Sequence, residues 1–290
     1  MKEIKIIKKE DELYPKNLLE IKNPPEQLYV LGDVSLLNKK SLAIIGSRNC
    51  TEYGYNQAMR FATEIANKDI CIVSGMAVGI DSAAHVGAKM EKGKTIAVLG
   101  GGFNNIFPKE NEELFYKILE CGGCIISEYA PDVKADNKNF PSRNRIVSGL
   151  SEGLLVVEAR YRSGTSITAK FAKEQGKKIF CIPSNVDSTT GYGTGVLIQN
   201  GAKLVLNPND ILKSFGISAL EEVIVEENET DIKVDEEYIE VYETLSKIPI
   251  NTNEICKITR KTIGEVNVTL TMLELQGIIK QVGANEFIKI

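Results

Sequence analysis

Short apolar runs recur along the first two thirds of the chain, and longer stretches with helical spacing separate them. The runs are rich in Ile, Val and Leu and apolar at successive rather than alternate positions, which is typical of parallel strands that are covered on both faces. This alternation predicts a doubly wound α/β fold with a parallel sheet. The expected strands are residues 42–46, 70–74, 95–99, 124–127, 154–157, 179–182 and 203–206, and residues 55–67 show helical spacing between the first two.

The pattern changes beyond residue 215. Residues 216–235 are acidic and poor in helix signals, which indicates a linker. Three stretches with helical spacing and two short apolar runs follow, which predict a winged helix-turn-helix plan. The helices are expected at 238–245, 251–258 and 262–275, and the strands of the wing at 278–282 and 287–290. The chain is therefore expected to comprise a short N-terminal extension (1–38), an α/β domain (39–215), the linker (216–235) and a small winged-helix-like domain (236–290).

Small and polar residues follow several predicted strands at their carboxyl ends, where open α/β sheets bind their ligands. Gly46, Ser47 and Arg48 follow the first strand. Residues 163–166 (Ser-Gly-Thr-Ser) open a helix just after Arg160 and Arg162. Glycine lets a ligand approach the backbone, and a helix N-terminus attracts phosphate. The same residues also suit an ordinary turn and an ordinary helix cap, so a phosphate site and a structural role both stay open.

An aromatic ring and two guanidinium groups precede the strand at 154–157. They belong to Phe140, Arg143 and Arg145. In one interpretation the arginines pair with nearby carboxylates, such as those of Glu128 or Glu158. In the other, the guanidinium groups bind phosphates and the ring lies under a base, which is the combination that single-strand binders use. The residues alone favour neither interpretation.

Charge is unevenly distributed along the chain. The net charge is −4 overall, but residues 217–290 contain 15 acidic and 7 basic residues, so the first 216 residues carry a balance of +4. A basic α/β domain permits a polyanionic partner. The acidic charge of the linker and the winged-helix-like domain, counted together, argues against reading of duplex DNA and favours a protein-binding or regulatory role. No apolar run of about 18 residues occurs and the N-terminus is highly charged, so we expect no membrane span and a cytoplasmic location.

Few residues are candidates for metal binding or catalysis. Cys121 and Cys124 have the spacing of metal ligands, but the chain lacks a second such pair and has one histidine, so we expect no metal site. That histidine, His85, lies one helical turn after Asp81, which is expected to cap the helix. No serine or cysteine nucleophile accompanies His85 in any motif, so no catalytic residue is assigned.

These segments, in their order along the chain, resemble the DNA-processing protein A family, also called Smf. The resemblance covers almost the whole chain. It implies an extended Rossmann-like core that binds single-stranded DNA without sequence preference, protects incoming DNA and loads the RecA recombinase during natural transformation and recombination. It also implies a homodimer, no cofactor and no enzymatic activity. The motifs that carry it include IIGSR at 44–48, SGMAVGIDSAAH at 74–85, FPSRNRIVSGLSEGLLVVEA at 140–159, SGTSITA at 163–169 and IQNGA at 198–202.

The resemblance also implies which residues form the DNA site. It assigns a phosphate contact to Arg48 in the turn with Gly46 and Ser47. It places Phe140, Arg143 and Arg145 in or beside the strand-binding pocket, with Asn144 shaping a turn between the arginines. The same pocket is expected to include Gly164, Thr165 and Ser166, with Lys170 one helical turn later.

An enzyme on the same fold is the alternative hypothesis. The sheet edge of related-looking phosphoribohydrolases binds a nucleotide and hydrolyses it. Their Pro-Gly-Gly-x-Gly-Thr signature has its nearest counterpart here in residues 162–165, which lack the second glycine and the following acid. Asp81 and Glu158 are the acids that such a reaction would have to use.

Overall fold

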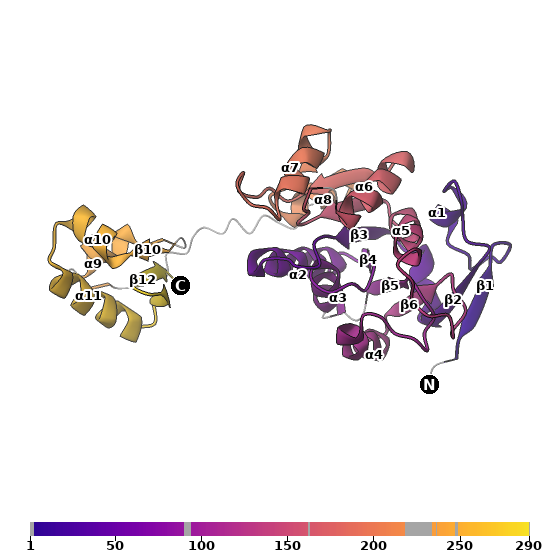
Figure 1. Ribbon diagram of the computed structural model, residues 1–290, viewed down its shortest axis with the longest axis horizontal. Coiled ribbons are helices and arrows are strands. Elements are labelled where there is room, and N and C mark those ends of the chain that lie inside the picture. The colour runs from indigo at the N-terminus through magenta and orange to yellow at the C-terminus, as the bar shows by residue number, and fades with distance from the viewer. Residues whose placement is uncertain are drawn as a thin grey trace. The chain divides into compact units, whose positions relative to one another are not determined.

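The computed structural model of the chain describes residues 3–89, 94–161, 163–217, 234–235, 237–246 and 249–289. Its contacts divide the chain into two units, Met1–Ala219 and Leu220–Ile290, named here the sheet unit and the winged unit (Figure 1). Most of the predicted linker, residues 216–235, lies outside the described residues.

A mixed sheet forms the centre of the sheet unit. Its order is β1-β2-β6-β5-β4-β3-β7-β8-β9, and β3 to β9 run parallel to one another as predicted. The prediction missed β1 and β2, which lie in the expected N-terminal extension and join the sheet antiparallel through the pairing of β2 with β6. The strands are β1 Lys5–Lys8, β2 Gln27–Gly32, β3 Ser41–Ile45, β4 Cys71–Ser74, β5 Thr95–Leu99, β6 Cys124–Ser127, β7 Gly153–Val156, β8 Lys178–Cys181 and β9 Lys203–Leu204.

Helices cover both faces of this sheet (Figure 1). Successive residues of β5 show why the strands are apolar throughout, because Val98 packs with Val147 of α5 whereas Leu99 packs with Phe115 of α4 on the other face. The first face carries α1 Lys16–Leu19, α5 Asn139–Leu150 and α6 Gly164–Glu174, the second carries α2 Glu52–Ala66, α3 Ile80–Lys89 and α4 Glu112–Glu120, and α7 Tyr192–Gln199 and α8 Pro208–Ser214 follow β8 and β9.

The chain leaves the centre of the sheet in two directions. Strand β3 lies between β4 and β7. After β3 the chain enters α2 on one face, and after β7 it enters α6 on the other face. The two connections therefore diverge at the carboxyl ends of neighbouring strands, which is the place where open α/β sheets form a ligand crevice.

Helix α5 contains the aromatic ring and both arginines of the stretch that precedes β7. It begins at Asn139 and includes Phe140, Arg143, Asn144 and Arg145. Asn144 therefore does not shape a turn. Pro141 is tolerated because it lies in the first helical turn, where backbone N–H groups have no partner within the helix. The helical spacing separates the motif, since Phe140, Arg143 and Asn144 share one side of α5 and Arg145 does not.

The winged unit has a small core of its own. Val266, Leu270 and Leu273 on α11 are buried there, and Thr262 and Glu265 form the capping box that begins the helix. Val268 and Leu275 are exposed although they belong to the same apolar pattern. The elements are α9 Ile239–Thr244, β10 Ile250–Asn251, α10 Thr252–Thr259, α11 Ile263–Leu275, β11 Ile279–Gly283 and β12 Glu286–Lys289; the prediction missed β10, which pairs with β12.

His85 is a core residue of the sheet unit. The hydroxyl of Thr95 donates to the carbonyl of Ile72 (2.8 Å), so Nδ1 of His85 is the donor in its 2.7 Å hydrogen bond with that hydroxyl. Burial, and secondarily the charge of Arg143, lowers the pKa of His85 to about 3. The imidazole is thus neutral and packed at neutral pH and does not meet Asp81.

We expect this histidine to make the sheet unit less stable in acid. Near pH 5 an unfolded histidine, with its pKa near 6.5, binds a proton that the buried ring rejects, which lowers the free energy of unfolding by about 2 kcal/mol relative to neutral pH. His85→Asn keeps an N–H near Thr95 and removes the titration. Denaturant unfolding of both proteins at the two pH values should show the smaller loss in the variant, and an equal loss would contradict the assignment.

Candidate functional site

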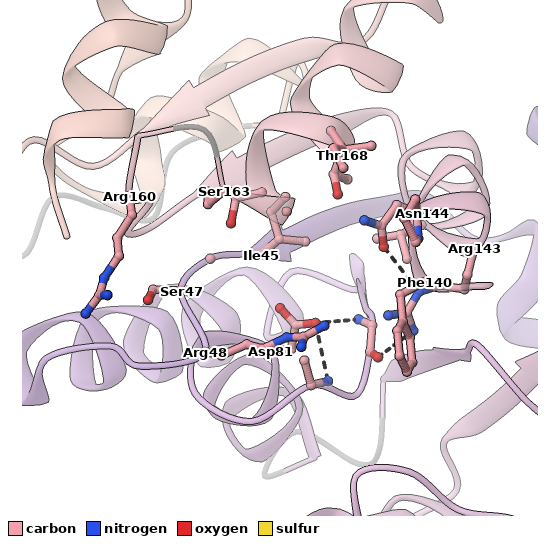
Figure 2. Close-up of a pocket in the computed structure, with 18 of the residues that line it drawn as sticks. Ile45, Ser47, Arg48, Asp81, Phe140, Arg143, Asn144, Arg160, Ser163 and Thr168 are labelled. Carbon is pink, nitrogen blue, oxygen red and sulfur yellow. Dashed lines mark hydrogen bonds between the residues drawn. The ribbon is translucent and has the colours of Figure 1, made fainter. Parts of the chain in front are cut away.

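A cleft of about 540 Å³ opens at the carboxyl edge of the sheet, where β3 and β7 diverge (Figure 2). Its walls come from the β3–α2 turn, the β4–α3 loop, helix α5 and the start of α6. Eight of the residues expected at the DNA site line it: Gly46, Ser47, Arg48, Phe140, Arg143, Asn144, Gly164 and Thr165. Ser166 and Lys170 line a neighbouring pocket along α6.

The glycine of the β3–α2 turn is required by packing within the chain. A Cβ at Gly46 would lie 2.6 Å from a side-chain carbon of Ile80 and 2.9 Å from the carbonyl oxygen of Glu158. The backbone N–H of Ile80 also donates to the carbonyl of Ser47 (3.2 Å), so this turn and the start of α3 support each other. The turn therefore ends in a fixed position and presents the exposed side chain of Arg48 to the cleft.

Phe140 belongs to a pair of aromatic rings. The ring of Phe107 lies 5.5 Å from it, centroid to centroid, and the Phe107 side chain is 51% exposed. The guanidinium carbon of Arg48 lies 5.6 Å from the centre of the Phe140 ring. A Cβ at Gly100 would come within 2.8 Å of Phe140, so the glycine after β5 makes room for the ring. The sequence analysis missed Phe107, because no spacing rule connects it to residue 140.

Arg143 is a buried part of the wall of the cleft. Its side chain donates hydrogen bonds to the carbonyls of Gly75 and Val98, and only 4% of the residue is exposed. Asp81 accepts from the backbone N–H groups of Gly75 (3.1 Å) and Ala77 (3.4 Å) and does not cap α3 as expected. The backbone of Gly75 is thus held at its N–H by Asp81 and at its carbonyl by Arg143.

Burial shifts both charged groups of this arrangement. It lowers the pKa of Arg143 to about 10, with Asp81 acting in the opposite direction. It raises the pKa of Asp81 against the opposing charge of Arg143. Arg143 therefore stays charged at neutral pH, and its guanidinium group interacts with the carbonyls of Gly75 and Val98 and with the charge of Asp81. The expected phosphate contact of this guanidinium does not fit its burial.

Arg145 lies outside both pockets. Its guanidinium group forms a two-pronged ion pair with Glu128 (2.6 and 3.0 Å), and its Nε donates to the carbonyl of Asn23 (2.9 Å). Of the two interpretations that the sequence left open, the carboxylate pairing is the one observed. The helical spacing of α5 explains the difference, because Arg145 lies on another side of the helix from Phe140 and Arg143.

The N-terminus of α6 lines the cleft, and its polar groups include a hydroxyl without a hydrogen-bond partner among the described residues. This hydroxyl belongs to Ser163 and is buried. A Cβ at Gly164 would meet no atom within 4 Å, so the space beside this helix start is open. Arg160, exposed on the approach to α6, also lines the cleft. Free N–H groups, a hydroxyl and a nearby cation together suit an anion.

The acids of the enzyme hypothesis have structural partners. Glu158 is buried and accepts from the backbone N–H (3.0 Å) and the hydroxyl (2.5 Å) of Thr51 at the start of α2. The carboxylate of Asp81 accepts hydrogen bonds from two backbone N–H groups of the β4–α3 loop. Arg162, part of the compared signature, lies outside the described residues. Within the part of the chain that the structure describes, no group of three His, Cys, Asp or Glu side chains is arranged to hold a metal ion.

Comparison with known proteins decides the family. Residues 5–216 match the family of DNA recombination-mediator protein A, and residues 226–285 match the DprA winged helix domain. The chain belongs to this family. The resemblance inferred from the motifs is thus confirmed, as is the α/β core with a C-terminal winged-helix domain.

Relatives of known name share this family. Protein Smf of Escherichia coli is 42% identical over 214 residues, which are 73% of this chain and 57% of that protein. DNA processing protein DprA of Bacillus subtilis is 40% identical over 203 residues, 70% of this chain and 68% of that protein. The chain therefore spans little more than half of the first relative and two thirds of the second.

Two solved structures of the family resemble about three quarters of this chain. DNA processing protein A of Streptococcus pneumoniae has a TM-score of 0.69 at 38% identity, over 73% of this chain and 74% of that one. The Helicobacter pylori protein, described for its single-stranded DNA binding mode, has a TM-score of 0.66 at 29% identity, over 74% of this chain and 98% of that one.

No helix formed by the described residues is long and apolar enough to cross a membrane.

Arg143 should matter for folding more than any exposed arginine of the cleft. Arg143→Met leaves the carbonyls of Gly75 and Val98 without their donor and removes the positive charge that acts on Asp81, which should lower the free energy of unfolding by about 3 kcal/mol. Arg48→Met, the matched control, removes an exposed side chain and should change it by less than about 0.5 kcal/mol. Denaturant unfolding measures both, and equal effects would be inconsistent with the buried role.

Proposed function

We propose that the sheet unit binds single-stranded DNA across this cleft and that the chain is a DNA-processing protein of the binding kind. One observation carries the proposal: the ring of Phe140, an exposed cation and an open helix N-terminus line the same cleft at the divergence of β3 and β7, and the ring of Phe107 packs beside that of Phe140. Single-strand binders combine a basic groove with rings on which bases stack. The single-stranded DNA binding of the Helicobacter pylori relative supports the same function.

The phosphates of the bound strand contact groups of the cleft that do not distinguish one base from another. Arg48 and Arg160 are exposed cations on the cleft. The first N–H groups of α6 and the hydroxyl of Ser163 add uncharged donors. Contacts of this kind position the sugar-phosphate chain without reading sequence. Binding is therefore independent of sequence.

The aromatic pair takes the bases. A base that stacks beside Phe140 meets the exposed ring of Phe107 as part of the same surface. Arg48, which lies over Phe140 in the free protein, is then available for a phosphate of the bound strand. Stacking tolerates every base because each base has a flat face. It follows that removal of either ring weakens binding to all sequences alike.

The roles of the remaining predicted residues are revised accordingly. Arg143 shapes the wall of the cleft. Arg145 joins α5 to the end of β6 through Glu128 and to the N-terminal segment through Asn23. Gly46 and Ser47 support the turn that carries Arg48. Ser166 and Lys170 extend the DNA path along α6, where Lys170 lies 3.8 Å from Glu174.

The wider role of the chain follows from the family. We propose that it protects incoming DNA and loads the RecA recombinase in recombination and natural transformation, acts as a homodimer and works in the cytoplasm. These statements rest on the resemblance of the motifs and on no contact within the chain. They stay predictions.

The winged unit is not proposed to read duplex DNA. Helix α11 corresponds to the recognition helix of a winged helix-turn-helix, and it contains Glu265 and Glu274 but neither lysine nor arginine. Lys261, which lies just before this helix, pairs with Glu240 at 3.1 Å. A duplex-binding face needs positive charge. A protein-binding or regulatory role fits this charge better.

The salt dependence of binding should identify the phosphate contacts. Arg48→Ala and Arg160→Ala should each weaken binding to unrelated oligonucleotides alike and reduce the slope of log affinity against log salt by about 0.7, because each removes one phosphate contact. Arg60→Ala on α2, an exposed arginine beside Glu64, is the matched control and should leave the slope unchanged. Fluorescence anisotropy over a salt series measures this. Unaltered slopes in both cleft variants would refute the proposed contacts.

The enzyme hypothesis has an equally direct test. Since Asp81 and Glu158 are held by backbone and hydroxyl donors of the chain, we expect no adenine to be released when the protein is incubated with AMP. Chromatography of the mixture detects the free base. If the wild type released adenine and the Glu158→Gln variant did not, the protein would be a hydrolase instead.

A further inference from the structure

We propose that Tyr161 and Tyr192 form a second base-stacking platform, which receives the DNA strand where it leaves the cleft beside Arg160. The inference rests on the proposed function and extends it, because it adds a subsite and a direction for the bound strand. The ligand of this platform is an unpaired nucleobase.

The two tyrosine rings form an exposed pair. Their centroids lie 5.6 Å apart with the ring planes at 90°, and the residues are 58% and 54% exposed. Less than half of the surface of either tyrosine is therefore buried within the sheet unit. A pair of neighbouring aromatic side chains that both stay this exposed offers flat apolar surface to a partner.

The backbone fixes where this pair lies. The N–H of Gly193 donates to the carbonyl of Ala159 (2.7 Å), so the start of α7 lies directly against the segment that follows β7. A Cβ at residue 193 would come within 2.5 Å of that carbonyl oxygen and 2.8 Å of the carbonyl oxygen of Arg160. Glycine permits this close approach. Tyr161 and Tyr192 flank the contact, so both rings are carried by anchored backbone.

The pair continues the path of the proposed strand. Arg160, the residue before Tyr161, lines the cleft, and Figure 2 shows it at the opposite side of the view from Phe140 with Arg48 between them. A strand that stacks on the Phe140 pair and passes Arg48 and Arg160 meets the tyrosines next. Rings at both ends with cations between them reproduce the alternation of stacking and charge that holds single strands.

The occupant is argued to be nucleic acid because of the adjoining charge. Arg160 is exposed next to the rings and lines a cleft whose exposed charged side chains are Arg48 and Arg160. An apolar protein segment would leave this guanidinium without a partner, whereas a sugar-phosphate chain supplies one for each base that stacks. If the strand leaves these rings unaffected in the titration described next, a peptide partner is favoured instead.

The absence of tryptophan from the chain gives a clean reporter. Tyr161→Trp introduces a single indole at the proposed platform. Tyr116→Trp on α4 is the matched control, because Tyr116 is also an exposed tyrosine (51%) that meets a neighbouring ring, that of Phe115, edge to face at 5.3 Å. Each protein is titrated with oligothymidylate of about 20 nucleotides. Tryptophan emission and the anisotropy of a labelled strand are recorded together.

We expect the indole at 161 to be quenched with the same midpoint as the anisotropy change, and the indole at 116 to keep its emission. If anisotropy reports binding while the indole at 161 keeps its emission, the second platform is overturned and the proposed DNA cleft stands. If anisotropy reports no binding to either variant or to the wild type, the proposed function fails and the platform fails with it.

Strand length provides an independent measurement. The double variant Tyr161→Ala, Tyr192→Ala should bind oligothymidylate of about 20 nucleotides about tenfold more weakly than the wild type and bind strands of about 5 nucleotides unchanged, because the short strand is held at the Phe140 end. Phe140→Ala should weaken both. Loss of affinity for neither length in the double variant would overturn the platform, and so would an equal loss for both.

Discussion

The buried guanidinium group of Arg143 is the interaction on which the geometry of the cleft depends. It joins three parts of the sheet unit, since it extends from α5 to the carbonyl of Gly75 after β4 and to that of Val98 in β5. Asp81 completes the arrangement by accepting from the N–H of Gly75. A charge that is removed from water in this way must keep all its partners, so the helix and both strand ends are held in one arrangement.

This rigidity determines what the exposed residues can do. Because Arg143 fixes α5, Phe140 lies against Gly100 and beside Phe107, and its ring meets the guanidinium group of Arg48. The β3–α2 turn that carries Arg48 is fixed separately by its contact with the start of α3. The Phe140 ring and the backbone turn that carries Arg48 are therefore preorganised, so little conformational freedom of the backbone is lost when a strand binds.

The arginines show how one residue type takes different roles within a short distance. Arg143 and Arg145 lie two positions apart on α5, yet one holds carbonyl groups and the other a carboxylate. Arg48 and Arg160 lie at the ends of strands β3 and β7, where the side chain reaches solvent at the cleft. The positive charge proposed to meet DNA thus comes from the strand ends, and the positive charge on the helix supports the structure.

The succession of parallel strands along the chain followed from the sequence, because apolar periodicity records which faces are buried and each parallel strand is short and apolar throughout. The edge of the sheet that forms the cleft followed from the same pattern, and the resemblance of the motifs supplied eight of the residues that line it. The antiparallel β1 and β2 escaped notice because they bury fewer of their residues than the central strands and leave a weaker pattern. Burial and pairing of individual arginines depended on contacts between segments far apart in the sequence, Arg143 with Val98 and Arg145 with Asn23. No local spacing records such contacts, so only the packed fold could separate the arginines that face a ligand from those that hold the protein together.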